Sequence, residues 1–234
     1  MTAKSWKRTK MTENVKRGSR GKKIFLLIIC LAGLTASICS YLGYHYYSVY
    51  QSEKRTMRSL ERDFEQLQAQ LQKAVSWYPS PEFYLELGRL RLLRAMAEIE
   101  FGQPEESEPY LSQASEVLKR AIYLRPVDYA AFWELSKVYF LMSYPLMVYA
   151  DRGRELCWEA IKRAPHDEFL VSNVLVVFFE QWLLLSEEEK TNIKLKIKDM
   201  EIANPGFLER FKKKWRKGHG DEKELALRLE ELGF

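Results

Sequence analysis

The segment ASEVLKRAIYLRPVDYAAFWELSKVYF, residues 114–140, contains two apolar patterns on either side of a proline. Before Pro126, small or apolar residues recur at gaps of four and three, and after it Phe132, Leu135 and Tyr139 follow a similar spacing. Such gaps place side chains on one face of an α-helix. Proline lacks a backbone donor and disfavours helix in the preceding residue. The segment therefore predicts two helices joined at Pro126.

The pattern of the first helix recurs along the chain, and each copy ends at a proline. The four copies are Leu67–Leu71–Ala74–Pro79, Ala114–Leu118–Ala121–Pro126, Gly153–Cys157–Ala160–Pro165 and Ile193–Ile197–Met200–Pro205. A second helical pattern follows three of the prolines, as Tyr84–Leu87–Gly88–Arg91, Phe132–Leu135–Ser136–Tyr139 and Val171–Val174–Leu175–Phe178. Stacked hairpins share one continuous core, which a single hairpin cannot form. The chain is therefore expected to be an array of helical hairpins, with small residues where paired helices cross.

These residues resemble the tetratricopeptide repeat family, and the resemblance covers about residues 67–210. It implies an all-α fold, a short α-solenoid whose role is to bind other proteins. The family repeat has about 34 residues, whereas successive prolines here are 47, 39 and 40 residues apart. Longer loops or longer helices are therefore expected, with the largest insertion at 101–110. The third repeat departs most, because Leu175 stands where the family has Gly and Met200 where it has Ala.

An apolar run near the N-terminus predicts a transmembrane helix at 24–47. No charged residue occurs between Lys23 and Glu53, and the run is long enough to cross a bilayer. Tyrosines at 41, 44, 46 and 47 predict an aromatic belt at one interface. A cleaved signal peptide, with Thr35 and Ser37 before the cut, is the alternative, but the run is too long and stays apolar past them.

The net charge of +5 is concentrated in the N-terminal tail. Residues 1–23 hold nine basic side chains and one acidic one, which leaves 28 basic and 31 acidic side chains in the remainder. The positive-inside rule therefore predicts a cytoplasmic tail at 1–23 and a single-pass protein whose repeat domain lies outside the cytoplasm. A bacterial inner membrane and a periplasmic repeat domain are what the resemblance of residues 181–215, described below, implies. The near-balanced body argues against nucleic-acid binding.

Two flanking helices complete the predicted domain organisation. Apolar residues at 50, 57, 60, 64, 67, 71 and 74 predict a helical stalk at 48–78 that continues the membrane helix. A homodimeric coiled coil through 50–76 is the alternative use of that stripe. The repeat domain is assigned to 79–217. Residues 218–234 predict a C-terminal capping helix that begins at Asp221, with Glu224 three residues later.

The sequence contains no pattern that predicts catalysis. His45, His166 and His219 lack Cys, Asp or Glu neighbours at metal-ligand spacing, and the GHG stretch at 218–220 lacks the elements of a phosphate loop. Cys157 is interpreted as a small buried side chain. We therefore expect no enzyme activity, no cofactor and no metal.

The family geometry places the first helix of each hairpin along a concave groove. The expected groove residues are Glu82, Leu85, Arg89, Ala130, Trp133, Lys137, Phe140, Ser172, Val176 and Phe179. Three of them carry large rings, which predicts an apolar groove for a helix or extended segment of a partner, with Arg89 and Lys137 as its charged rim. The alternative is that the stalk helix or the chain's own end fills the groove.

A basic segment follows the last repeat. Its charged residues are Arg210, Lys212, Lys213, Lys214, Arg216 and Lys217, interleaved with Phe207, Phe211 and Trp215. The rings are expected to face the core, which leaves the cations as a solvated face. An acidic partner, a phosphorylated lipid carrier or anionic lipid is the alternative.

The region 181–215 also resembles the end of small bacterial repeat proteins that accompany envelope polysaccharide assembly. The resemblance rests on Trp182, LSEEEK at 185–190, Asn204–Pro205, and Phe207 to Trp215. It implies a non-enzymatic membrane-anchored adaptor or scaffold that binds membrane or envelope proteins outside the cytoplasm. The alternative is a periplasmic chaperone-like factor that binds unfolded polypeptide, as repeat proteins of cytochrome maturation do.

Overall fold

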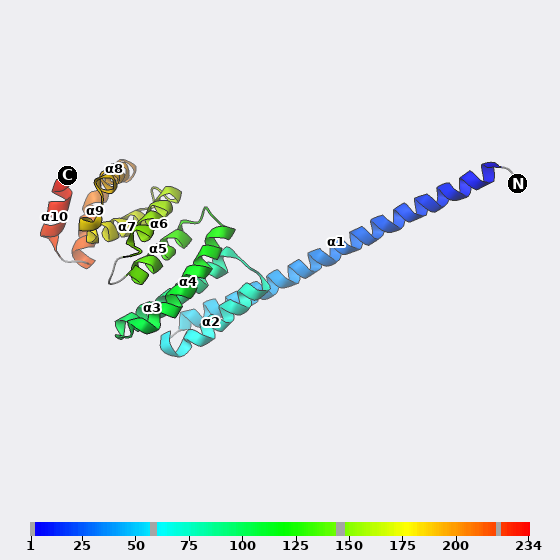
Figure 1. Cartoon of the computed structure of the whole chain (residues 1–234), viewed down its shortest axis with the longest axis horizontal. Helices are drawn as coiled ribbons and strands as arrows, with labels where there is room; N and C mark the ends of the chain where they lie inside the picture. Colours follow the sequence, from blue (N-terminus) through cyan, green and yellow to red (C-terminus); the bar gives the residue numbers. More distant parts are fainter. Residues whose placement is uncertain (1–2, 57–59, 144–147, 219–220) are drawn as a thin grey trace. The chain divides into compact units, whose positions relative to one another are not determined.

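The computed structural model describes residues 3–56, 60–143, 148–218 and 221–234, with side chains from residue 25 onward except 56–62. Every regular element in these ranges is helical (Figure 1). The sequence-based assignment to the all-α class is therefore confirmed. Predictions that involve Met57 and His219 lie outside the described residues.

The chain divides into two compact units, residues 1–83 and 84–234. The boundary falls inside helix α3, Pro81–Glu100.

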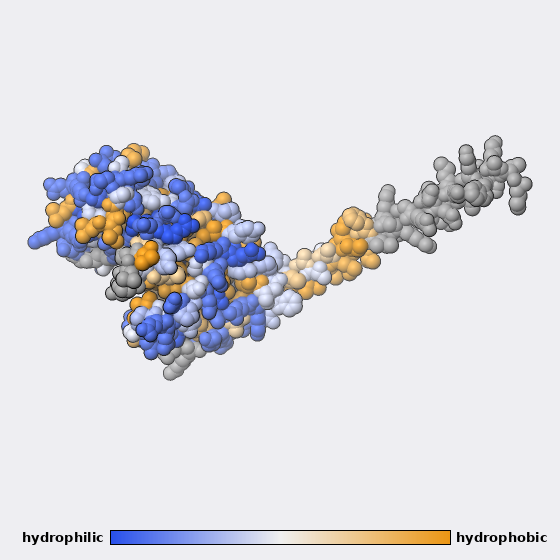
Figure 2. All heavy atoms as spheres, viewed as in Figure 1, coloured by the Kyte–Doolittle hydropathy of each residue, from blue (hydrophilic) through white to orange (hydrophobic). Residues whose placement is uncertain are grey.

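Helix α1, Ala3–Thr56, contains the predicted membrane span. Residues Phe25–Arg55 are long and apolar enough to cross a membrane, and the most apolar part is unburied. Apolar side chains from Phe25 to Ile38 are exposed around the helix, and Figure 2 shows them as an orange band along α1. Water disfavours such an all-round apolar surface, whereas lipid accommodates it. Among the described residues, α1 is the one helix long and apolar enough for single-pass anchoring.

The predicted stalk is a hairpin rather than one continuous helix. Helix α1 ends at Thr56, and α2, Leu60–Trp77, packs back along it. Gln66 near the start of α2 donates a hydrogen bond to Glu53 at 2.8 Å, whereas Tyr78 beyond its end lies against Gly43. These two contacts make the helices antiparallel. The apolar spacing correctly predicts helical structure here, but spacing alone does not show that the chain reverses direction.

The apolar stripe of α2 is buried within the chain. Phe64, Leu67, Leu71 and Ala74 are all almost fully inaccessible to solvent. These residues carried the alternative prediction of a homodimeric coiled coil through 50–76. Within the chain, α1 packs against α2 and this face is covered. The homodimer stays a prediction.

The second unit contains the rest of α3 and the following helices. Their bounds are α4 Pro104–Leu124, α5 Tyr129–Ser143, α6 Ala150–Arg163, α7 Glu168–Glu180, the 3-10 turn η1 Trp182–Leu184, α8 Glu187–Ala203, α9 Phe207–Gly218 and α10 Glu222–Glu231. Pro79, Pro126, Pro165 and Pro205 each lie just before a helix, as predicted. Much of the predicted insertion at 101–110 is instead helix, because α4 begins at Pro104.

Small residues let the paired helices approach closely. A Cβ atom at Gly88 of α3 would lie 2.5 Å from Leu118 Cγ of α4. Arg91 of α3 donates to the carbonyl oxygen of Gln113 at 3.3 Å. Together, the Gly88–Leu118 and Arg91–Gln113 contacts show that α3 and α4 are antiparallel. Ala121 and Ala160 are buried, as expected for crossing positions.

Buried Arg154 of α6 joins three segments. Its guanidinium donates to Glu189 of α8 at 2.8 Å and to Gln181, which follows α7, at 3.3 Å, and it also pairs with Asp151. Glu189 in turn completes the capping box with Ser186 that starts α8. A buried guanidinium is stable only when its donors are satisfied, so these bonds fix the spacing of α6 and α8.

The last two helices cover the end of the core. The carboxylate of Asp221 accepts from the backbone N–H groups of Lys223 and Glu224, which confirms the predicted helix start. Trp215 of α9 is buried and donates to the carbonyl oxygen of Asp221 at 3.0 Å. Arg228 of α10 donates to the carbonyl oxygen of Phe179. Helices α9 and α10 therefore close the apolar face at the end of α7.

Candidate functional site: a cleft between α6 and α8

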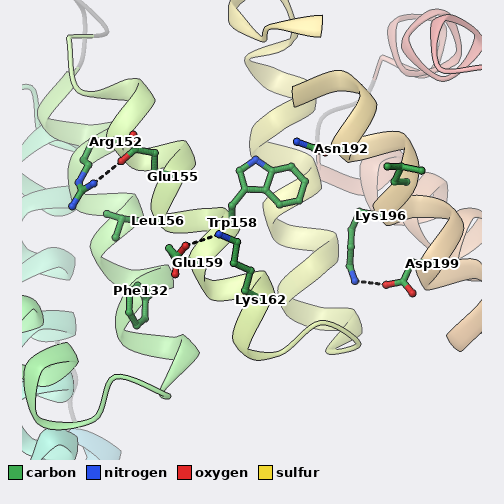
Figure 3. Close-up of a pocket in the computed structure, with 11 residues that line it drawn as sticks. Phe132, Arg152, Glu155, Leu156, Trp158, Glu159, Lys162, Asn192, Lys196 and Asp199 are labelled. Atoms are coloured by element: carbon green, nitrogen blue, oxygen red, sulfur yellow. Dashed lines mark hydrogen bonds and ion pairs between the residues drawn. The ribbon is translucent and has the colours of Figure 1, made fainter. Parts of the chain in front are cut away.

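An open cleft of about 810 Å³ lies between α6 and α8, with part of α5 at its edge. Its lining residues are Phe132, Arg152, Glu155, Leu156, Trp158, Glu159, Lys162, Asn192, Leu195, Lys196 and Asp199. Figure 3 shows the α6 and α8 side chains converging on the space between the two helices. None of these residues belongs to the groove or the basic segment predicted from the sequence.

The apolar part of the cleft centres on Trp158. Its ring lies 5.1 Å from the ring of buried Phe178 in α7, which holds the indole in place. Phe132 and Leu156 are buried, whereas Leu195 of α8 is 58% exposed. The cleft therefore presents an anchored indole and an uncovered leucine on opposite helices.

The charged part of the cleft consists of pairs along single helices. In α6, Arg152 contacts Glu155 at 2.5 Å and Lys162 contacts Glu159 at 2.7 Å. In α8, Lys196 contacts Asp199 at 2.5 Å. The lining thus holds three cations and three carboxylates, and each cation has a partner one turn away. Its net charge is near zero, so it favours neither a strongly acidic nor a strongly basic ligand.

Two acidic groups of the cleft, Glu159 and Asp199, are stabilised as carboxylates. Hydrogen bonds from Lys162 and then Arg163 lower the pKa of Glu159, and a hydrogen bond from Lys196 lowers the pKa of Asp199. A general acid or base works best when its pKa is near the operating pH. These shifts move the pKa of both carboxyl groups further from that range.

The predicted rim residues Arg89 and Lys137 share one partner within the chain, the carboxylate of Glu134. Arg89 of α3 contacts Glu86 at 2.8 Å and Glu134 of α5 at 3.1 Å, and Lys137 contacts Glu134 at 2.8 Å. Burial alone would lower the pKa of Arg89, but the hydrogen bond with Glu86 and the charge of Glu134 outweigh it and raise that pKa. Arg89 therefore joins α3 to α5.

The predicted apolar groove does not extend over all its assigned residues. Phe179 is fully buried, because Phe211 and Trp215 of α9 and Trp182 pack on its ring. The chain's own end therefore covers this ring, which is the alternative predicted for the groove. Leu85, Ser172 and Val176 are also buried.

The remaining groove residues are partly accessible. The half-buried ring of Trp133 lies 5.0 Å from Lys137 Nζ, and Phe140 packs against Gly153. Ala130 is half-buried. Glu82 belongs to the first unit, where it hydrogen-bonds Ser80. Trp133 and Lys137 thus remain the accessible centre of the predicted groove.

Most of the predicted basic patch is paired with acidic or polar groups. Arg210 binds Glu168 through two hydrogen bonds of 2.6 and 3.0 Å, and Lys212 binds Glu209. Arg216 pairs with Glu222, and Lys214 donates to Asn173 at 2.9 Å. Burial lowers the pKa of Lys214. Lys213 and Lys217 are exposed. The predicted core-facing rings Phe207, Phe211 and Trp215 are buried.

Cys157 is an inert core residue. Its thiol is inaccessible, and burial raises its pKa to about 12 despite a hydrogen bond with Ser136. Among the described residues, no three His, Cys, Asp or Glu side chains are grouped so as to hold a metal ion.

One feature of the sequence points to the α6 side of the cleft. Trp158 interrupts a charged stretch, RGRELCWEAIKR, in which acidic and basic residues recur three apart on α6. Which second helix faces that stretch depends on the tertiary arrangement. No family model matches the chain, and no curated protein shows significant similarity to it.

Proposed function

We propose that this chain is a non-enzymatic, membrane-anchored adaptor whose hairpin domain binds a segment of a partner protein. The observation that carries the proposal is the α6–α8 cleft, whose lining contains Trp158 of α6, exposed Leu195 of α8 and three pairs of opposite charges. Aromatic anchors with a polar surround are typical of protein-binding surfaces. The uncovered apolar span of α1 supports attachment to a membrane.

The hairpins support a solenoid of the tetratricopeptide type. First helices are linked to first helices, through Arg89–Glu134 between α3 and α5 and Tyr129–Asp167 between α5 and the start of α7. Repeated hairpins stacked this way form extended binding surfaces. The cleft uses the second helices, α6 and α8, whereas the predicted groove around Trp133 uses the first.

In this proposal the protein is located in a bacterial inner membrane, with a cytoplasmic N-terminus and an extracytoplasmic hairpin domain. It rests on the basic tail at 1–23 and on the resemblance of 181–215 to envelope polysaccharide assembly proteins. A partner among membrane or envelope proteins would follow. The second candidate function is a chaperone-like factor for extended polypeptides, which the apolar lining of the open cleft also favours.

Photo-crosslinking in intact membranes tests the proposal. A photoreactive residue replaces Leu195 in the cleft or, as the control, Ile202, which is 83% exposed on the same helix but does not line the cleft. We expect one discrete adduct from position 195 and none from 202. Many adducts at 195 would favour the chaperone-like function. Equal crosslinking at both positions would contradict the cleft as the binding site.

A further inference from the structure

The end of α2 brings exposed aromatic rings beside the end of the apolar span. Trp77 is 43% exposed and Tyr78 is 37% exposed. Tyr78 packs beside α1, where its ring lies 5.9 Å from that of Tyr44 and its Cβ would lie 2.5 Å from a Cβ at Gly43. Tyr41 and Tyr44 on α1 are also exposed. Rings from two distant parts of the sequence therefore gather at one level of α1.

That level coincides with the length of a membrane span. Residues 25–42 of α1 precede the contact with Tyr78, and at about 1.5 Å per residue they measure about 27 Å. The hydrocarbon core of a bilayer is roughly 30 Å thick. If α1 is inserted, the end of α2 stands where hydrocarbon gives way to lipid headgroups.

We propose that Trp77 and Tyr78 join Tyr41 and Tyr44 in one aromatic collar that contacts the lipid headgroup region. The first unit would then touch the membrane twice, through α1 and through the turn between α2 and α3. This proposal rests on the membrane anchoring proposed above. It adds a second lipid contact that the apolar run of α1 does not itself contain.

The chemistry of the collar fits a lipid interface. Indole and phenol rings combine an apolar body with a hydrogen-bonding end, and they concentrate at the membrane–water boundary. Lys73 adds a cation about one turn above Trp77, with its Nζ 5.6 Å from the ring of Tyr46. A cation at that height can meet lipid phosphate while its stem covers the tyrosine. The opposite end of the hairpin, near Glu53 and Gln66, is polar.

Fluorescence quenching by spin-labelled lipids tests the collar. The full chain, with Cys30→Ala and Cys39→Ala, carries an NBD fluorophore at a cysteine in place of exposed Ser76, which leaves Trp77 and Tyr78 intact. Matched labels replace Glu65, on an exposed position of α2 about 16 Å away, and Leu34 within the span. The proteins are reconstituted in phosphatidylcholine–phosphatidylglycerol vesicles with nitroxides at acyl carbon 5 or 12.

We expect the label at 76 to be quenched by the carbon-5 nitroxide at least twofold more than the label at 65. The label at 34 should be quenched most by the carbon-12 nitroxide. Trp77→Gln should reduce quenching at 76, whereas Gln72→Ala, at an exposed position of the same helix, should not. Strong quenching at 34 with equal, weak quenching at 76 and 65 would overturn the collar but leave the anchor. Absence of quenching at 34 would overturn the proposed anchoring as well.

Discussion

The ring of Phe140 in α5 lies directly against the backbone of Gly153 in α6. A Cβ atom at position 153 would lie 2.5 Å from Cε1 and 2.7 Å from Cδ1 of that ring, closer than van der Waals contact permits. The α5–α6 hairpin, which supplies one wall of the cleft, therefore depends on the absence of a side chain at this position.

We expect Gly153→Val to destabilise the second unit. The added methyl groups must displace a packed ring, and overpacking of this kind costs about 2 kcal/mol. For a unit of this size, the melting temperature should fall by roughly 5 °C. Gly218→Val is the matched control, because a Cβ there meets nothing within 4 Å. Equal thermal midpoints for the two variants would show that the α5–α6 contact is not close in solution.

Stability should depend on pH through Glu189. Burial alone would raise its pKa, but hydrogen bonds from Ser186 and Arg154 outweigh burial and lower the pKa below the ordinary 4.5. A carboxyl group with a depressed folded-state pKa stabilises the fold above its unfolded-state pKa, and this contribution is lost as the pH falls through the folded-state value. Urea unfolding between pH 7 and pH 3 should therefore show decreasing stability below about 4.5.

The variant Glu189→Gln isolates this effect. It should be less stable than the parent protein at pH 7, because Arg154 loses its charged partner, and it should lose less stability on acidification. Glu188→Gln changes an exposed neighbour and should follow the parent curve. Parallel curves for the parent and Glu189→Gln would contradict the role assigned to the Arg154–Glu189 pair.

Partner capture should distinguish the cleft from the predicted groove. Leu195→Glu places a charge on an exposed position of the cleft, so we expect about tenfold weaker capture with an unchanged melting temperature. Ile202→Glu is the control on the same helix. If the partner instead uses the groove, Trp133→Ala should weaken capture and Leu195→Glu should not. Affinity for the crosslinked partner and thermal melting provide the two readouts.

Cys157 should react only after unfolding. With a pKa of about 12, its thiolate fraction at pH 8 is roughly 10⁻⁴, and its sulfur is inaccessible. In a Cys30→Ala/Cys39→Ala variant, maleimide labelling should be negligible in buffer and complete in denaturant. Rapid labelling of the native protein would contradict the packing between α5 and α6.

Membrane orientation can be read from fusions. A reporter that works only outside the cytoplasm should be active when fused after Phe234 and silent when fused after Arg20, because nine basic residues hold the tail inside. The reverse result would contradict the proposed localisation and membrane orientation. It would leave the lipid collar open to the separate quenching test.

Short-range signals in the sequence locate most of the helices and their ends. Prolines at 79, 126, 165 and 205 and apolar residues three and four apart located the hairpins, because both features act within one or two turns of the chain. Continuous apolar character located the membrane span for the same reason. The wide proline spacing showed that the repeats are longer than those of the tetratricopeptide family. In the structure, the extra residues lie largely in helices α3 and α4.

Which helix faces pack together depends on the tertiary structure. The stripe Phe64–Leu67–Leu71–Ala74 required a covering surface, and reversal of the chain after α1 supplied one within the chain. The ring of Phe179 had the spacing of a groove residue, yet α9 buries it. The cleft exists because Arg154 and its partners fix α6 beside α8. Periodicity shows that a helix face is buried or exposed, whereas its partner depends on contacts between residues far apart in the chain.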